Sequence, residues 1–326
     1  MKNDEFESSL RPLYLKDYIG QSDLTSNLKI FIEAAKKRNE TLDHVLLYGP
    51  AGLGKTTLAK IIANEMGANI KYCSGPSIEK VGDLASLLST LEAGDILFID
   101  EIHQIPRNVE EVLYSAMEDF VLQIIINRDV NSKTIDIELP PFTLIGATTK
   151  AGCLSFPLRS RFGINIKIDF YSVEELTKIM ERTSEFFNIK IEENAAIEIA
   201  KRSRGTPRIA NQLFKRIRDY FLVHNLEIID FENATKALNS LKIDELGLNE
   251  LDISYLQTLT KRFKGGPVGI NTISSALGED VNNIEDVCEP YLIKIGMIDR
   301  TAKGRIASKK AYNHLKTHIY WYNWLV

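Results

Sequence analysis

The stretch GPAGLGKT, residues 49–56, decides the fold of this chain. It fits the pattern GxxxxGK followed by Ser or Thr, and it stands between the apolar run His44–Tyr48 and a helical pattern over Thr57–Met66. A strand, a glycine-rich turn and a helix in this order are typical of a P-loop, in which inward-facing N–H groups and the helix N-terminus bind phosphate. We expect Lys55 to reach the β- and γ-phosphates of a nucleotide and the Thr56 hydroxyl to ligate Mg²⁺. The alternative is a glycine-rich turn without a ligand, and the combination of strand, helix, lysine and threonine argues against it.

The second motif is ILFIDE, residues 96–101. A buried strand over Ile96–Asp100 would deliver carboxylates to its carboxyl end, where α/β sheets place their ligands. We expect Asp100 to hold Mg²⁺, through water, and Glu101 to orient or deprotonate the attacking water. Acids at a strand end are common, so this interpretation depends on the P-loop upstream.

The third motif is GATT, residues 146–149, which ends another apolar run. A hydroxyl at this place could contact both the γ-phosphate and the attacking water. Either Thr148 or Thr149 could supply it. A simple turn at the end of a strand is the alternative.

Three arginines complete the candidate set: Arg159 and Arg161 in FPLRSRFG, and Arg208 in GTPRIAN. Phosphoryl transfer depends on charge stabilisation, and an arginine supplied to the site is worth about 10³–10⁵ in rate. An arginine of a second domain can also report the loss of the γ-phosphate. Each of the three, taken singly, is also compatible with a surface ion pair.

The first half of the chain alternates short apolar runs with helical patterns, which predicts a parallel α/β sheet. Phe142–Gly146 is a third strand candidate, and Val121–Ile126 with Thr134–Leu139 predicts a hairpin outside the sheet. The next part is helical in period and predicts a small all-helical domain. Its segments are Val173–Phe187, Glu193–Ser203, Arg208–Val223 and Phe231–Leu241.

The carboxyl end predicts a winged helix. Helical patterns over Ile253–Phe263, Asn271–Leu277 and Asn282–Ile295 precede MIDRTAKGRIAS, which suggests two short strands around a basic turn. Between Asp299 and His318 there are six Lys or Arg residues and one acid. We therefore expect three domains, 1–168, 169–243 and 244–326.

Composition limits the class of protein. The chain has 326 residues, a net charge of −4, 44% hydrophobic and 26% charged residues, which are ordinary values for a folded protein. No apolar run approaches the roughly 20 residues that span a bilayer, and the polar N-terminus is no secretory signal, so we expect a cytoplasmic protein. The three cysteines form no metal or disulfide pattern, and we expect His314 and His318 to be exposed on a basic helix.

The motifs occur in the order typical of AAA+ ATPases, beginning with DYIGQ, residues 17–21. From Leu10 to Lys316 the chain resembles one family in particular, the bacterial motors that drive branch migration of Holliday junctions. The strings that carry this resemblance are LDHVLLYGPAGLGKTTLA, GDILFIDEIH, EEVLYSAMEDF, PPFTLIGATT, PLRSRFG, AKRSRGTPRIAN, GGPVGIN and EPYLIKIGMIDRT. The resemblance implies an α/β P-loop AAA+ core, an all-helical lid and a C-terminal winged helix.

The same resemblance implies ATP and Mg²⁺ as cofactors and a role for each position. Arg161 would be the finger presented to the neighbouring subunit's ATP in a hexameric ring, and Arg208 the sensor in the lid. The hairpin 121–139 would contact the junction-binding protein RuvA, with the resolvase RuvC joining the resolving complex. Arg300 and Arg305 would touch the phosphates of duplex DNA. The residues bordering the nucleotide would be Leu10, Arg11, Tyr18, Ile19, Gly52, Leu53, Gly54, Lys55, Thr56, Thr57, Glu118, Asp119, Phe120 and Tyr171.

Some positions depart from the family's pattern, and two other classes of protein remain open. Ala51 stands where proline is usual, Gln104 where arginine is usual, and the wing reads RTAKGR where RTPRGR is common. An origin-recognition-type initiator, which is an ATP-gated DNA-binding module, also joins an AAA+ core to a winged helix. Sequence-specific binding would favour it. A protein-remodelling ATPase or clamp loader would respond to protein instead of DNA.

Overall fold

The computed structural model describes residues 10–126 and 133–317. It divides the chain into two compact units, Met1–Tyr171 and Ser172–Val326. Each unit has its own core. In the parts described, no helix combines the length and the apolar character needed to cross a membrane.

The first unit is built on a sheet of five parallel strands in the order β2-β3-β6-β1-β7. The three central strands have almost fully buried side chains, whereas edge strand β7 is buried only on alternate residues and the side chains of edge strand β2 are partly buried or exposed. Because all strands run the same way, every loop that leaves a carboxyl end emerges at one edge of the sheet. The strands are β1 (Val45–Tyr48), β2 (Ile70–Ser74), β3 (Ile96–Asp100), β6 (Thr143–Thr148) and β7 (Ile164–Lys167).

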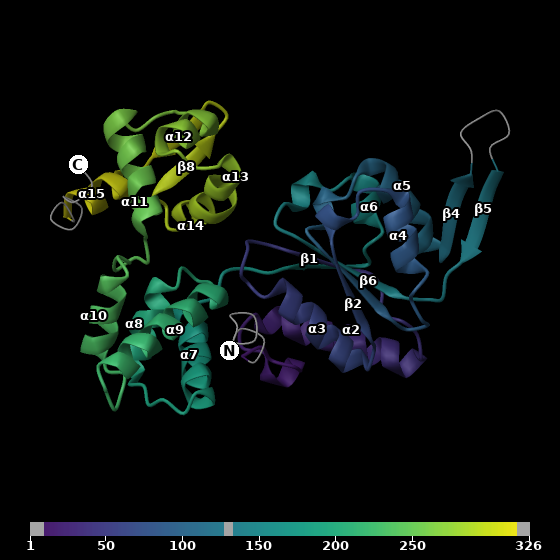
Figure 1. The fold of residues 1–326 in the computed structure, drawn as a ribbon, viewed down its shortest axis with the longest axis horizontal. Helices are drawn as coiled ribbons and strands as arrows, with labels where there is room; N and C mark the ends of the chain where they lie inside the picture. Colours follow the sequence, from purple (N-terminus) through teal and green to yellow (C-terminus); the bar gives the residue numbers. More distant parts are fainter. Residues whose placement is uncertain (1–9, 127–132, 318–326) are drawn as a thin grey trace. The chain divides into compact units, whose positions relative to one another are not determined.

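Helices cover both faces of this sheet (Figure 1). On one face, alternate strand residues such as Leu46, Leu97 and Leu144 form a core with α4, α5 and α6. The other face is covered by α2 and α3. The helices are α2 (Ser22–Arg38), α3 (Lys55–Met66), α4 (Val81–Leu88), α5 (Arg107–Glu118) and α6 (Phe156–Ser160), with short 3₁₀ turns at Leu15–Asp17, Gly75–Ser77, Ile102–Gln104 and Ala151–Cys153.

The predicted hairpin forms a separate two-stranded sheet that stands away from the main one (Figure 1). Its strands are β4 (Val121–Ile126) and β5 (Lys133–Glu138), paired antiparallel with Val121 opposite Glu138. The predicted turn between them lies outside the described residues. Ile135 and Ile137 of β5 are exposed.

The second unit begins with four helices, as the sequence predicts. Two of them start with a side-chain cap: Ser172 forms a capping box with Glu175, and Asp230 accepts a hydrogen bond from the N–H of Asn233. Such caps satisfy N–H groups that have no partner within the helix. The helices are α7 (Val173–Phe186), α8 (Glu193–Arg202), α9 (Pro207–Val223) and α10 (Phe231–Ser240).

The carboxyl-terminal part is a winged helix, as expected. Two short antiparallel strands pair Arg300 with Arg305. The helices of this part pack around a core that includes Tyr255, Leu259 and Leu292, with Ile298 added from the first strand. π-helical turns at Thr258–Arg262 and Ile284–Cys288 interrupt what the sequence presents as two continuous helices. The elements are α11 (Glu250–Gln257), α12 (Ile270–Leu277), α13 (Val281–Asn283), α14 (Glu289–Lys294), β8 (Ile298–Thr301), β9 (Gly304–Ala307) and α15 (Lys309–Thr317).

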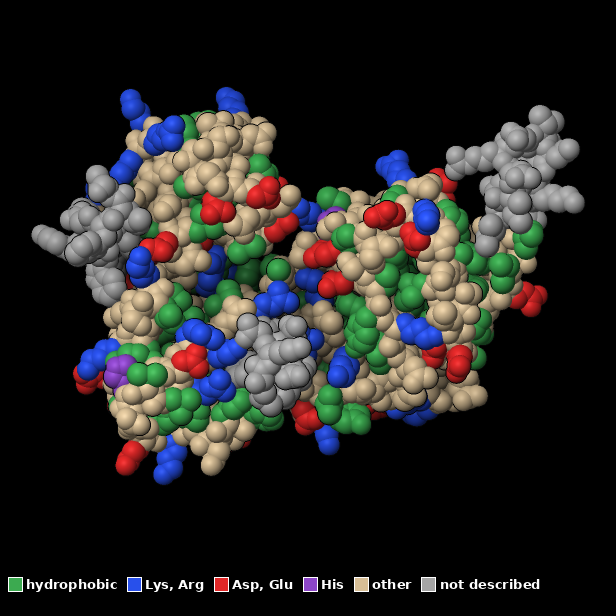
Figure 2. All heavy atoms as spheres, in the orientation of Figure 1, with side chains coloured by type: hydrophobic (Ala, Val, Ile, Leu, Met, Phe, Trp, Pro, Cys, Tyr) green, Lys and Arg blue, Asp and Glu red, His purple; other side chains and the backbone are tan. Residues whose placement is uncertain are grey.

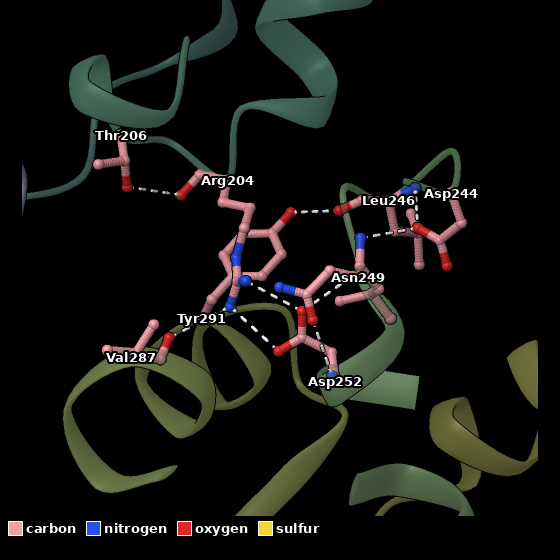
Figure 3. Close-up of polar contacts among 9 residues, drawn as sticks. Arg204, Thr206, Asp244, Leu246, Asn249, Asp252, Val287 and Tyr291 are labelled. Carbon is pink, nitrogen blue, oxygen red and sulfur yellow. Dashed lines mark hydrogen bonds and ion pairs between the residues drawn. The ribbon is translucent and has the colours of Figure 1, made fainter. Parts of the chain in front are cut away.

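A buried ion pair joins the four-helix part to the winged helix (Figure 3). The Arg204 guanidinium, between α8 and α9, donates to both oxygens of Asp252 in α11 at 2.9 and 3.3 Å, and their side chains are 6% and 1% exposed. The Tyr291 ring lies 4.8 Å from the same guanidinium, and the Tyr291 hydroxyl donates to the Leu246 carbonyl at 2.7 Å. Removing one partner of such a pair costs about 3–5 kcal/mol, so this contact holds the two parts in one arrangement.

The expectation of an exposed His314 is wrong. Its Nε2 lies 2.7 Å from the Asp244 carboxylate, and both side chains are buried. Burial raises the pKa of Asp244, but hydrogen bonds from His314 and from the N–H of Leu248 outweigh that effect and lower it. Basic neighbours in the sequence suggested exposure, whereas His314 lies on the inner face of α15 together with Ala311. His318 lies outside the described residues.

Candidate active site

The P-loop curves around the ammonium group of its own lysine. Lys55 is only 7% exposed, and its Nζ donates to the carbonyls of Gly49 at 2.8 Å and Pro50 at 3.0 Å. Gly49 has φ of +147°, and a Cβ there would lie 2.3 Å from the Ile168 carbonyl oxygen, so only glycine fits where the loop leaves β1. The positive group thus already lies inside the turn in which the phosphates of a nucleotide would be bound.

Two tyrosines far apart in the sequence meet at this loop. The Tyr18 and Tyr171 hydroxyls are 2.7 Å apart, and Tyr171 donates to the Leu53 carbonyl at 3.4 Å. Ile19, next to Tyr18 in the chain, is partly buried, and Leu10 is buried. The structure therefore brings two of the residues expected to border the nucleotide, Tyr18 and Tyr171, to the P-loop.

The second motif lies at the same edge of the sheet. Asp100 ends β3, and its Oδ1 accepts a hydrogen bond from the Glu101 N–H at 3.0 Å. Thr56 lies in the first turn of α3. Among the described residues no three His, Cys, Asp or Glu side chains are grouped to hold a metal ion. The hydroxyl of Thr56 and the carboxylate of Asp100 fit Mg²⁺, which prefers few protein oxygens together with phosphates and water.

The two candidate threonines have different surroundings. The N–H and the hydroxyl of Thr149 both donate to Oε2 of Glu101 at 3.2 Å. Thr148 is fully buried, and its hydroxyl lies 3.0 Å from Nδ1 of His103 while it accepts from the Lys150 N–H. Of the two, therefore, Thr149 is in contact with the carboxylate expected to act on water.

Arg161 lies toward the opposite edge of the sheet from its own P-loop. It follows α6 and precedes β7, whose first residue Ile164 is paired with Val45 at the amino end of β1. The P-loop leaves the carboxyl end of β1, and four strand residues span about 13 Å. Arg159, the other arginine of this segment, lies over the Tyr48 ring at 6.0 Å.

Glu118 and Phe120 lie at the same edge of the sheet as Arg161, the edge where the strands begin. The Arg161 guanidinium donates to Glu118 at 2.9 Å. The Phe120 ring packs at its edge against His44, which directly precedes β1. His44 links α5 to this edge, since its Nδ1 accepts from the Leu144 N–H and its Nε2 can then donate to the Met117 carbonyl. Burial lowers the pKa of His44, in keeping with a neutral ring. Glu118, Asp119 and Phe120 are therefore grouped with Arg161, apart from the P-loop of the same chain.

Arg208 belongs to the second unit. It lies in the first turn of α9 and is exposed. Within the described part of the chain its guanidinium has no hydrogen-bond or ion-pair partner, in contrast to the buried Arg204 four residues earlier. Such a side chain is available to an anionic ligand.

The wing arginines are bound to acids of their own domain. Glu289 is fully buried and accepts from Tyr255 at 2.9 Å, from Arg300 Nε at 2.6 Å and from Arg305 Nε at 3.0 Å. Arg305 also donates to Glu285 at 2.6 Å, and its side chain is only 14% exposed, against 43% for Arg300. Arg305 thus acts first as a counter-ion of Glu289.

Other cations of the winged helix face outward, and Figure 2 shows Lys and Arg side chains projecting from the top of this domain. Lys303, Lys309, Lys310 and Lys316 are among its exposed residues.

Sequence reasoning missed several residues of these sites. The ring of His103 lies 3.2 Å from Glu101. The only sign of this contact in the sequence is that His103 comes two residues after Glu101. Tyr114 lies four residues before Glu118 in a helical segment, and this spacing could have indicated that the two side chains are neighbours. Nothing in the sequence around Glu289 indicates that it binds two arginines, because the contact depends on the tertiary fold.

The chain is similar to known proteins over most of its length. Family models match three consecutive parts: the Holliday junction DNA helicase RuvB P-loop domain over residues 10–168, the RuvB AAA lid domain over 171–244, and the RuvB C-terminal winged-helix domain over 245–316. The chain is similar to the solved Thermotoga maritima RuvB Holliday junction branch migration motor, with 49% identity over 94% of this chain and 98% of that one and a TM-score of 0.87. A single-residue mutant of that protein matches with the same identity and coverage and a TM-score of 0.88. With a P-loop ATPase domain, a lid and a winged helix all matched, the chain belongs to the RuvB family of Holliday junction branch-migration ATPases.

Proposed function

We propose that this chain is an ATP-driven translocase that moves duplex DNA through its ring and so drives branch migration of Holliday junctions during homologous recombination and DNA repair. The observation that carries the proposal is the division of one catalytic set between two edges of a sheet. Lys55, Asp100, Glu101 and Thr149 lie at the carboxyl edge, whereas Arg161 lies at the amino edge. A single chain then holds two half-sites, and adjacent copies would complete each other's sites.

In this proposal the nucleotide is bound by residues 52–57, with Leu10, Arg11, Tyr18, Ile19 and Tyr171 around it. Thr56 and Asp100 would hold Mg²⁺, Glu101 would act on the attacking water, and Thr149 would hold Glu101. The bound metal would neutralise charge on the phosphates. Arg161 and residues 118–120 would face the nucleotide of the next subunit, in a hexameric ring.

The surface of α6 supports assembly of copies. Phe156 is 82% exposed on the short helix that precedes Arg161. A phenyl ring at this exposure is a candidate for burial at an interface, since aromatic side chains are enriched there. A second copy whose P-loop receives Arg161 would cover it.

Movement would pass from the lid to the winged helix. Arg208 would bind the γ-phosphate from the lid, and loss of that phosphate would release it. Because Arg204 and Asp252 fix the lid to the winged helix, the two would rotate together. The domains proposed for this cycle are 1–168, 169–243 and 244–326. The 121–139 hairpin would contact RuvA, and RuvC would join the resolving complex. The proposed location is the cytoplasm.

An origin-recognition-type initiator is not favoured, because family models of the branch-migration motor match all three parts of the chain. The two functions differ in one assay. The purified chain should dissociate a synthetic four-way junction in the presence of Mg·ATP, faster when RuvA is added, and at similar rates for junctions of unrelated sequence. Binding confined to one DNA sequence, without dissociation, would contradict the proposal.

The division of the site predicts complementation between subunits. Arg161→Ala alone should bind ATP and lose about 10³-fold or more in turnover. Glu101→Gln alone should also bind ATP without hydrolysing it. A mixture should recover part of the activity, because a ring that contains both variants holds some sites with an intact Glu101 facing an intact arginine. The measurement is steady-state ATPase against the mixing ratio, and a strictly additive result would rule out a shared site.

Gly75 provides a test of Glu101. Glu101 has φ of +49°, and a Cβ on Gly75 would lie 2.3 Å from the Glu101 carbonyl oxygen. Gly75→Ala should therefore displace Glu101 and lower kcat by about 10²-fold while KM for ATP changes little, since misplacement by about 1 Å can cost that much. Gly82→Ala, where a Cβ meets nothing within 4 Å, is the matched control and should keep its activity. Equal kcat values for the two variants would argue against this role.

In the wing, we expect one substitution to change DNA affinity and another to change the stability of the fold. Lys303 is exposed in the turn between β8 and β9, so Lys303→Glu should weaken duplex binding at every sequence, reduce its salt dependence and leave the Tm unchanged. Arg305→Ala should lower the free energy of unfolding by about 3–5 kcal/mol, because Glu289 is left as a buried charge with one counter-ion fewer. Thermal unfolding and binding anisotropy measure the two effects. A stable Arg305→Ala variant with weak binding would instead make Arg305 a simple phosphate contact.

A further inference from the structure

The guanidinium of Arg161 is held from three directions within its own chain. It lies 4.4 Å from the centre of the Tyr114 ring, one nitrogen donates to Glu118 at 2.9 Å, and another donates to the Pro157 carbonyl at 2.7 Å. Its Nε is buried and has no hydrogen-bond partner among the described residues. The side chain is 19% exposed, so its direction is fixed by contacts and not by solvent.

Two of these contacts come from one face of α5. Tyr114 and Glu118 are four residues apart, so their side chains are neighbours on the helix surface. An aromatic face and a carboxylate at this spacing bind a guanidinium by stacking and by a charged hydrogen bond together. Glu118 is 54% exposed, and exposed ion pairs contribute little to stability. The contact therefore directs Arg161 more than it stabilises the fold.

The Tyr114 ring is itself anchored. Its hydroxyl donates to Glu110 at 2.9 Å and lies 3.0 Å from the hydroxyl of Ser155. Ser155 also donates to Glu110, and it caps α6 by accepting from the Leu158 N–H at 3.2 Å. Burial raises the pKa of Tyr114, so the phenol keeps the proton that it donates. This network joins α5 to the helix that carries Arg161.

We infer that Tyr114 is a positioning residue for Arg161: its ring, anchored through Glu110 and Ser155, aims the guanidinium at the nucleotide of the adjacent subunit, and Glu118 assists. The inference rests on the proposed action of Arg161 across the subunit interface. A charge that stabilises phosphoryl transfer must be in place before the reaction, because reorientation during the step would cost part of its effect. An arginine side chain with no such support would sample many rotamers.

The experiment compares three variants of the full chain. Tyr114→Leu removes the ring, Tyr114→Phe removes only the hydroxyl anchor, and Glu118→Gln removes the charge. We expect kcat to fall about 10²-fold for Tyr114→Leu and less for Tyr114→Phe, with KM for ATP unchanged, because the P-loop lies at the other edge of the sheet. Glu111→Gln, an exposed acid on the same helix, is the control for Glu118→Gln and should not change kcat.

Mixing separates positioning from a structural role. A Tyr114→Leu subunit keeps its own P-loop, Asp100 and Glu101, so mixing with Glu101→Gln, which keeps Tyr114 and Arg161, should restore activity. Mixing with Arg161→Ala should restore none, because neither subunit then presents a placed arginine. The inference would be overturned by recovery of activity with Arg161→Ala or by no recovery with Glu101→Gln. It would also be overturned if thermal unfolding showed that Tyr114→Phe does not fold. If Arg161→Ala with Glu101→Gln also fails to recover, the proposed trans action is itself at fault.

Discussion

The common direction of the five strands is the constraint on which the rest of this protein depends. Because β1, β3 and β6 all end at one edge, the P-loop, Asp100 and Thr149 meet there without any long-range pairing designed for them. The same polarity places what precedes the strands at the other edge. Arg161, just ahead of β7, and Glu118, at the end of a helix that runs back from β3, are thereby separated from the P-loop of their own chain. In the proposed ring, adjacent copies of the chain would bring the two halves together.

The arginines of this chain show how burial decides what a cation can do. Arg204 stays bound to Asp252, because breaking this buried ion pair during the proposed ATPase cycle would cost too much free energy. Arg305 pairs mainly with Glu289, while Arg161 is held by an exposed acid and an aromatic ring, contacts that orient its guanidinium and leave the side chain 19% exposed. Arg208 has no such contact among the described residues. The arginine with the strongest contacts, Arg204, is the one proposed to join the lid to the winged helix. Arg161 has weaker contacts and is the proposed finger, and Arg208, with none among the described residues, is the proposed sensor.

The sequence predicted the elements whose signal is local. Three strands buried on both faces, β1, β3 and β6, and the four lid helices were recognisable, with ends shifted by one or two residues. The edge strands β2 and β7 were missed, because the side chains of β2 are only partly buried or exposed, those of β7 are buried on alternate residues, and no continuous apolar run marks either strand. The P-loop was readable since its function requires contiguous residues. The choice between Thr148 and Thr149 was not, because adjacent residues of a strand point to opposite sides and only the position of Glu101 separates them.

Charge patterns were the least reliable guide, for a physical reason. A run of Lys and Arg residues in the wing suggested a phosphate-binding surface, yet the acids that neutralise Arg300 and Arg305 lie on α14 and the turn before it. A one-dimensional count cannot detect partners brought close by the fold. Since Glu289 and Glu285 together offset two arginines, the positive charge proposed to bind DNA comes from exposed lysines of the winged helix, and Lys303 lies in the turn between β8 and β9. A flexible ammonium group there suits a motor, because it binds phosphate as a point charge and does not read the base sequence.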